Sequence, residues 1–300
     1  MKNKKHAKKK KKRFPLVPAI VALMFFGGAS IFLYPTVSNY FAEKNSSKKA
    51  DEYSHQVMLL DEETAERELR KAIEYNEALA GDPVRDPFIE GSGMALPTNY
   101  LDVLNIGGTM CTIEIPKIHV KLPVLHGTST EVLERAAGHI RQTAVPIGGV
   151  GNHPVITGHT GLSEAKLFTD LINLAEGDIF IIHVLRQTLY YEVYDVSVVL
   201  PEDISVLEPI ENMDCVTLVT CTPYGVNSYR LLVRGIRAEK PAEEIIRELE
   251  NAKRTLSEII IEYSAVFIVI LIIILITAGR VFFTVINRKK KTKSKNTRGI

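Results

Sequence analysis

Cysteine is scarce in this chain, which has three in 300 residues and has no tryptophan at all. The three are Cys111, Cys215 and Cys221. So small a number excludes a fold held together by a disulfide framework. Their spacing also does not match that of a structural zinc site. A single Cys111–Cys215 bridge stays open at this point, beside the simpler interpretation that both are buried strand residues.

Acidic residues are missing from both ends of the chain. Residues 1–13 contain nine Lys or Arg and residues 287–300 contain seven, which leaves 21 basic residues against all 35 acidic ones in between. Each basic end borders an apolar run, 14–37 or 263–286, long enough to span a membrane. Lys and Arg accumulate on the cytoplasmic side of such spans. The pattern predicts two transmembrane helices, both termini in the cytoplasm, and an extracellular middle.

Two alternatives bear on these ends. The first run could be a cleaved signal peptide instead of an anchor. A basic arm for nucleic acid would not explain why each tail adjoins an apolar run, so we expect no nucleic-acid partner. The tails are instead expected to touch anionic lipid head groups.

The segment 38–109 precedes a β-rich region. Residues 38–50 are polar and read as a linker. Residues 51–80 lack Pro and Gly and are rich in good helix formers, which predicts a helix that ends at Gly81-Asp82-Pro83. A turn-rich stretch follows up to Phe88. At the other end, a charged stalk is predicted over 241–262.

Residues 110–240 carry many short β-type runs separated by Gly and Pro, which is typical of a barrel or a sandwich. The predicted strands lie around 110–125, 153–157, 178–184, 188–200, 215–221 and 230–237. Short helices are predicted at 130–137 and 163–174.

One β-rich run ends in Cys221, and Pro223 and Gly225 then break the strand before a second apolar run, 231–236. If the two strands are neighbours, Cys221 and Arg230 lie side by side at one end of the sheet. A thiol near a fixed positive charge loses its proton more easily. The guanidinium can also bind a developing oxyanion. The alternative is that Cys221, like most lone cysteines, is only a small buried hydrophobe.

A base would decide between these interpretations. His159 follows a short apolar strand in a Gly-flanked turn, and histidine suits proton transfer near neutral pH. His, Cys and Arg at three strand ends would form a thiol acyl-transfer site. His153 is the closest rival of His159, and Arg234 is the rival of Arg230.

The motifs Thr157-Gly158-His159 and Thr217-Leu218-Val219-Thr220-Cys221-Thr222-Pro223, with Arg230 nine residues after the cysteine, resemble those of sortases. Sortases are membrane-anchored cysteine transpeptidases of Gram-positive bacteria. The resemblance implies an eight-stranded β-barrel with the site at one mouth. It further implies Cys221 as nucleophile, His159 as general acid/base and Arg230 for the oxyanion and substrate, with no metal or organic cofactor.

Asp86-Pro87-Phe88 resembles the lid of class C, the pilus-assembling sortases, and a second membrane span also fits that class. By this resemblance Asp86 would reach Arg230 and Phe88 would cover Cys221. The residue before the arginine, often His in such proteins, is Tyr229 here, which bears only on substrate preference.

The class C resemblance implies a substrate and a reaction. The enzyme would cleave an LPxTG-like sorting signal between Thr and Gly through a thioester, and join it to a pilin lysine. The alternatives are a housekeeping-type sortase that anchors surface proteins to peptidoglycan precursor, and a non-catalytic membrane-tethered scaffold.

Overall fold

The structure, a computed structural model, describes residues 16–79, 99–162, 165–203 and 212–239, together with Glu208, Arg247, Ile274 and Gly279. For part of the first helix it describes only the backbone. Residues 1–239 form one compact unit and residues 240–300 a second. All elements described below belong to the first unit.

Two helices precede the barrel, α1 (Leu16–Leu59) and α2 (Glu62–Ala78). The break between them occurs at Asp61, whose carboxylate accepts a hydrogen bond from the Thr64 amide at 2.7 Å and caps α2. The prediction of one helix over 51–80 and a linker over 38–50 was therefore wrong in its boundaries. The polar segment 38–50 continues α1, and the helix-capping aspartate, not a Gly or Pro, divides the helical region.

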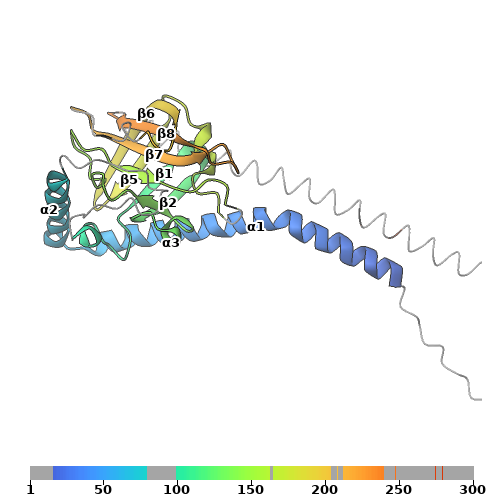
Figure 1. Ribbon diagram of the computed structural model, residues 1–300. Helices are drawn as coiled ribbons and strands as arrows, with labels where there is room; N and C mark the ends of the chain where they lie inside the picture. The colour runs from blue at the N-terminus through green and yellow to red at the C-terminus, as the bar shows by residue number, and fades with distance from the viewer. Residues whose placement is uncertain are drawn as a thin grey trace, which may run out of the picture. The chain divides into compact units, whose positions relative to one another are not determined.

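The C-terminal part of α1 packs along the barrel beside β1 and β2, as Figure 1 shows. Tyr53 is buried there and its hydroxyl donates to the Met110 carbonyl at 3.2 Å and accepts from the Leu185 amide at 2.9 Å. Asp51 forms an ion pair with Lys121 on β2 at 2.6 Å. The helix is thus attached to the barrel by one buried hydroxyl and by one ion pair at the surface.

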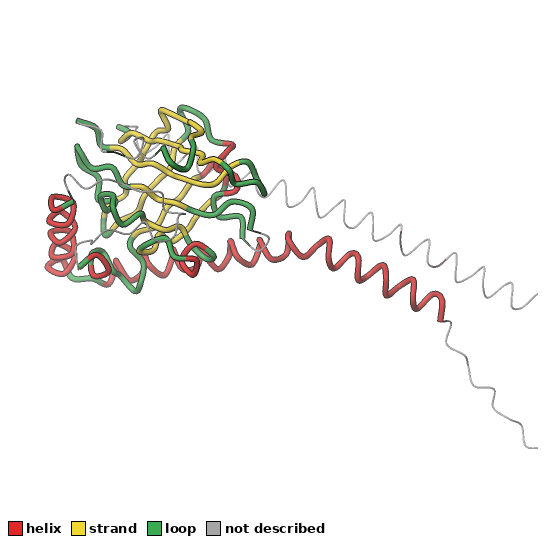
Figure 2. Tube along the Cα trace, in the orientation of Figure 1, coloured by secondary structure: helices red, strands yellow, loops and turns green. Residues whose placement is uncertain are grey.

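Eight strands form a closed barrel in the order β1-β2-β3-β4-β7-β8-β6-β5, which confirms the predicted eight-stranded barrel (Figure 2). The strands are β1 (Cys111–Ile115), β2 (Val120–His126), β3 (Ala137–His139), β4 (Val155–Thr157), β5 (Ile179–Val184), β6 (Gln187–Val199), β7 (Cys215–Thr222) and β8 (Tyr229–Arg237). The pairs β2–β3 and β4–β7 are parallel, and the other pairs are antiparallel. Two parallel pairs place the ends of strands that are distant in sequence at the same mouth.

Short helices fill the connections: α3 (Thr130–Leu133) and three single-turn 3-10 helices, η1 (Tyr100–Asp102), η2 (Pro116–Ile118) and η3 (Thr169–Asn173). The helix predicted over 130–137 is shorter, because β3 begins at Ala137. The prediction of a helix over 163–174 was also wrong. Its described part forms only η3, and Gly161 and Thr169 join through a backbone-to-hydroxyl bond of 3.1 Å that favours a compact loop.

A buried polar cluster ties the segment before β1 to the barrel. The Tyr100 hydroxyl lies 3.0 Å from His139 Nδ1, and it accepts from the Gly127 amide at 2.9 Å. His139 Nε2 donates to the Ala144 carbonyl at 2.8 Å, so its Nδ1 is the accepting nitrogen of a neutral ring. Burial lowers the pKa of His139 to about 4. The cluster therefore contains a histidine held neutral.

The described residues do not establish the two membrane spans predicted at 14–37 and 263–286. Within the residues that the structure describes, no helix is long and apolar enough to cross a membrane. The predicted span 263–286 lies outside those residues apart from Ile274 and Gly279, and so does the start of the span 14–37. Both spans stay predictions.

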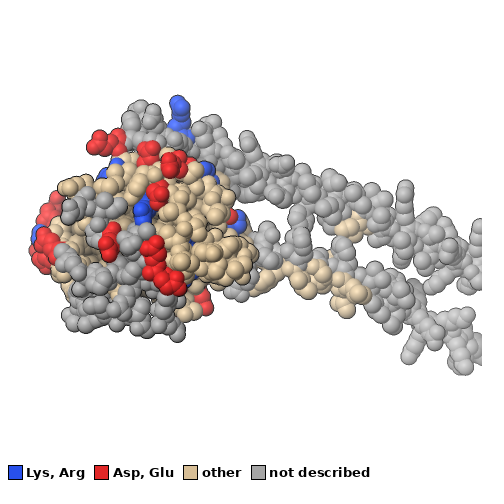
Figure 3. Space-filling view, turned by 45° about the horizontal axis from the view of Figure 1, so that its top comes forward, with Lys and Arg blue, Asp and Glu red and all other residues tan. Residues whose placement is uncertain are grey.

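The charge of the barrel unit follows the sequence pattern. On the face drawn in Figure 3, acidic side chains are spread over the surface and outnumber the basic ones. This matches the excess of acidic residues between the two basic ends.

Candidate active site

Cys221 and Arg230 lie directly opposite each other on β7 and β8. The ladder ends one position further along, where Thr222 lies opposite Tyr229. Cys221 forms no disulfide within the described part of the chain, and its side chain is partly exposed. The prediction that the two strands are neighbours, with thiol and guanidinium at one sheet end, is confirmed by this register.

His159 reaches the same mouth from β4. The parallel pairing of β4 with β7 ends with Thr157 opposite Val219. His159 and Cys221 each follow two residues later, so they lie at the same level. Two bonds continue the pairing past the strand: the Gly158 amide donates to the Val219 carbonyl at 3.1 Å, and the Thr220 hydroxyl donates to the Gly158 carbonyl at 2.7 Å.

The three side chains also share a face of the sheet. Side chains alternate along a strand, so Cys221 projects on the side of Val219, and Arg230 on the side of Leu232. Val219 and Leu232 pack with Val155 of β4 in one small apolar cluster. This cluster is the floor beneath the site, and the alternation brings the His, Cys and Arg side chains to one side.

Close packing fixes the turn that carries His159. A Cβ at Gly158 would lie 2.9 Å from the Phe168 ring, so only glycine fits there without movement. The Phe168 amide in turn donates to the His159 carbonyl at 3.2 Å. The Gly in this motif therefore serves the packing of the turn, and the turn holds His159 at the end of β4.

The electrostatics of His159 combine two opposing effects. Burial lowers the pKa of His159, and the carboxylate of Glu134 acts to raise it. A half-buried imidazole with a depressed pKa is largely neutral at neutral pH, which suits a group that must accept a proton.

The rival residues lie elsewhere on the same sheet face. Arg234 pairs with Thr217, four residues and so about 13 Å from Cys221 along β7, and its guanidinium lies 3.8 Å from the Asp195 carboxylate. His153 is buried and contacts the Thr217 hydroxyl at 2.6 Å through Nε2. Both rivals belong to a polar group at the far end of the strands.

The other two cysteines are buried, and the structure has no Cys111–Cys215 bridge. Burial raises the pKa of the Cys111 thiol above its ordinary value. A buried, protonated thiol is unreactive. Of the three cysteines, only Cys221 is accessible to a substrate.

The loop between β7 and β8 forms an exposed apolar rim. Tyr224 and Val226 are each about two-thirds exposed (67% and 69%), and Tyr229 is 42% exposed. The Tyr224 ring lies 3.5 Å from where a Cβ at Gly161 would stand, so this loop meets the loop that follows His159. The sequence analysis assigned no role to Tyr224 and Val226, because a turn that contains Pro and Gly gives no signal for which side chains it exposes.

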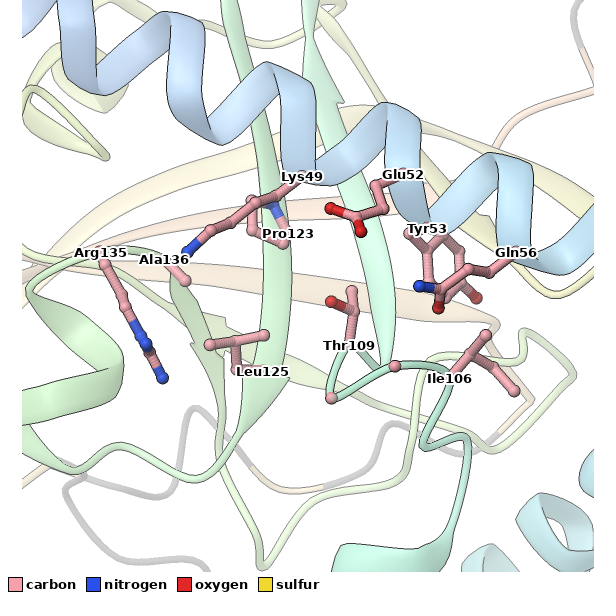
Figure 4. Close-up of a pocket in the computed structure, with 12 residues that line it drawn as sticks. Lys49, Glu52, Tyr53, Gln56, Ile106, Thr109, Pro123, Leu125, Arg135 and Ala136 are labelled. Atoms are coloured by element: carbon pink, nitrogen blue, oxygen red, sulfur yellow. The ribbon is translucent and has the colours of Figure 1, made fainter.

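A pocket of about 230 Å³ opens between α1 and β2, on the far side of β3 from His159. Figure 4 shows Lys49, Glu52 and Gln56 of α1 on one wall, and Arg135 extending from the segment before β3. Pro123 and Leu125 of β2 form part of the floor. Arg135 also forms an ion pair with Glu131 at 3.4 Å.

Two further expectations concern the site. The predicted lid, Asp86, Pro87 and Phe88, lies outside the residues that the structure describes. Within the described part of the chain, no group of three His, Cys, Asp or Glu residues is placed to hold a metal ion.

Fold and site together define a class of protein: a closed β-barrel that presents a cysteine, a histidine and an arginine at one mouth. A family model described as the sortase domain matches residues 113–238. The chain belongs to the sortase family of cysteine transpeptidases.

Solved structures and sequence relatives agree with this placement. Sortase C-1 from Actinomyces oris is 46% identical with a TM-score of 0.57, over 59% of this chain and 99% of that one. Sortase C-1 from Streptococcus pneumoniae is 39% identical with a TM-score of 0.61, over 65% and 100%. Sortase SrtE1 of Streptomyces coelicolor is 28% identical over 148 residues, 45% of this chain and only 42% of that relative. The structural neighbours are thus class C sortases.

Proposed function

We propose that this chain is a class C sortase that joins pilin subunits through a thioester on Cys221. The observation that carries the proposal is the strand register that brings His159, Cys221 and Arg230 to one mouth of the barrel. No single strand provides this arrangement, because it needs the parallel β4–β7 pair and the antiparallel β7–β8 pair together.

In the first step, the neutral His159 ring accepts the proton of the Cys221 thiol, and the resulting thiolate attacks the threonine carbonyl of the Thr–Gly bond in an LPxTG-like sorting signal. Arg230 stabilises the negative charge on the carbonyl oxygen, as a fixed donor does in an oxyanion hole. His159 donates its proton to the leaving amine and becomes neutral. The product is a thioester between the substrate threonine and Cys221.

In the second step, a lysine amine of the next pilin attacks the thioester and forms an isopeptide bond. The support is the similarity to class C enzymes, among them a pilus-related sortase C of Group B Streptococcus that is 36% identical over 98% of its length. A Streptococcus pneumoniae sortase C described with respect to pilin substrate specificity is equally similar, at 36% identity.

The site of action follows from the sequence. We place the barrel outside the cell, held by membrane spans at 14–37 and 263–286 with both basic ends in the cytoplasm. Anchoring confines enzyme and substrate to one surface and raises their effective concentration. A protease added to intact cells would cleave the barrel region but spare tags on both termini. Cleavage of either tag contradicts this topology.

The test of pilin joining uses the full chain, as wild type and as Cys221→Ala. Each is mixed with a sorting-signal peptide and a pilin that bears the acceptor lysine, and the products are read by intact mass. A peptide–pilin conjugate formed only by the wild type supports the proposal. A thioester that transfers to a peptidoglycan-type amine but not to the pilin would favour a housekeeping sortase. A chain that forms no adduct would favour a scaffold.

A further inference from the structure

Glu134 lies at the catalytic mouth because of the pairing of β3 with β4. These strands are antiparallel, with Gly138 opposite Thr157. Continued by two positions, the same register places Ala136 beside His159. Glu134 ends α3 two residues before Ala136, and its charge acts on the His159 ring. The carboxylate therefore stands near the imidazole, on the β3 side of the site, opposite to Arg230.

The Glu134 side chain is exposed and uncommitted. Within the described residues, its carboxylate has no hydrogen bond and no ion pair. The neighbouring Arg135 does not neutralise it, because Arg135 extends into the pocket beside α1 (Figure 4) and pairs with Glu131. The site thus has a cation on the β8 side and a free anion on the β3 side of Cys221 and His159.

We propose that Glu134 binds the ε-ammonium of the acceptor lysine and delivers the amine to the thioester beside His159. This inference rests on the proposed function. A lysine amine has an ordinary pKa of about 10.4, so it arrives as a cation. The Glu134 carboxylate attracts such a cation to the β3 side of the site. The two sides therefore sort the two substrates, with the sorting signal near Arg230 and the acceptor near Glu134.

The acyl group then passes from Cys221 to the lysine amine. The bound ammonium first loses one proton to water. The amine then attacks the thioester carbon, the C–N bond forms, and the C–S bond breaks. The second proton passes from nitrogen to the neutral His159 imidazole, and Cys221 leaves as the thiolate. The thiolate and imidazolium needed for the next acylation are thereby restored, and no further reactant is required.

The test compares Glu134→Gln with wild type in the full chain, and Glu131→Gln serves as the matched control on the same helix. Each protein is first acylated with a sorting-signal peptide and then given one of two acceptors. One is a lysine amide, which is cationic, and the other is hydroxylamine, which is neutral at the same pH. E134Q is expected to lower kcat/KM for the lysine acceptor by about threefold to tenfold, mainly through KM.

The ratio of kcat/KM for lysine to that for hydroxylamine should fall in E134Q, because any change at His159 acts on both acceptors alike and cancels in this ratio. An NMR titration of His159 should show a lower midpoint in E134Q, because a carboxylate that favours the charged ring has been removed. Glu131→Gln should match wild type throughout.

Equal use of lysine by E134Q and wild type overturns the inference and leaves the proposed function intact. So does a loss with hydroxylamine as large as that with lysine, which would show a general effect on the site. If the wild type forms a thioester but transfers it to neither amine, the proposed pilin joining fails, and this inference fails with it.

Discussion

Acidification should weaken the attachment of the segment 99–105 to the barrel, because His139 must gain a proton in a fully buried site. His139 has a pKa of about 4 in the folded chain and an ordinary value of 6.5. Its stabilising contribution is fully present above pH 6.5 and is lost as the pH falls toward 4, since the unfolded chain binds the proton first. The difference corresponds to about 3 kcal/mol of unfolding free energy below both values.

Burial and the neighbouring His126 oppose the protonation of His139, whereas the Ala144 carbonyl favours it. His126 pairs with it across β2 and β3 and lowers its pKa further, and Arg141 lies over the Tyr100 ring at 4.9 Å. The Tyr75 hydroxyl of α2 donates to the Arg141 carbonyl at 2.7 Å, so the same cluster also attaches α2. A protonated His139 would add a second positive charge beside Arg141. Within the described residues, no carboxylate forms a hydrogen bond or an ion pair with either group.

The assay is urea unfolding of the full chain, followed by far-UV circular dichroism because the chain lacks tryptophan, at a series of pH values. His139→Gln removes the titration while keeping an amide that can donate and accept. The free energy of wild type minus that of the variant should fall by about 2.5 kcal/mol between about pH 7.5 and about pH 4.5. A difference that is independent of pH would show that His139 does not stay neutral in the folded chain, because His139 titrates only in the wild type.

Further predictions concern the site and its support. Arg230→Ala should slow thioester formation by about 100-fold, as the loss of an oxyanion donor does, while Arg234→Ala should stay within about threefold. If the two variants lose the rate of thioester formation by the same factor, the assignment of the oxyanion role to Arg230 is wrong. Gly158→Ala should lower the unfolding free energy by about 1–3 kcal/mol, because its Cβ would stand 2.9 Å from the Phe168 ring. An unchanged urea midpoint would contradict that packing. Tyr53→Phe should cost about 1–3 kcal/mol, because a buried amide donor loses its acceptor; a cost near zero would show that water replaces it.

The strands that carry the cysteine and the arginine were predictable from the sequence. Val and Thr dominate the run that ends in Cys221, and Pro223 with Gly225 marks the loop. The closed barrel itself came from the sortase resemblance, because strand order depends on pairings that a single sequence does not encode locally.

Other parts could not be predicted because tertiary contacts decide them. The sequence of β3, Ala137-Gly138-His139, has no strand pattern, and the neighbours β2 and β4 impose its extended form. A Cβ at Gly138 would clash with the Gly127 carbonyl oxygen, so this strand also needs its glycine for close packing. Glu134 gave no signal either, since a glutamate at the end of a short helix looks like any solvated residue. Only the β3–β4 register brings it near His159.

The role of Cys221 in forming the thioester is tested most directly by the intact mass of the full chain after incubation with a sorting-signal peptide. We expect a mass increase equal to the peptide up to its threonine, removed by hydroxylamine, and no increase in Cys221→Ala. An adduct of equal yield in the Cys221→Ala chain, or none in the wild type, would contradict it.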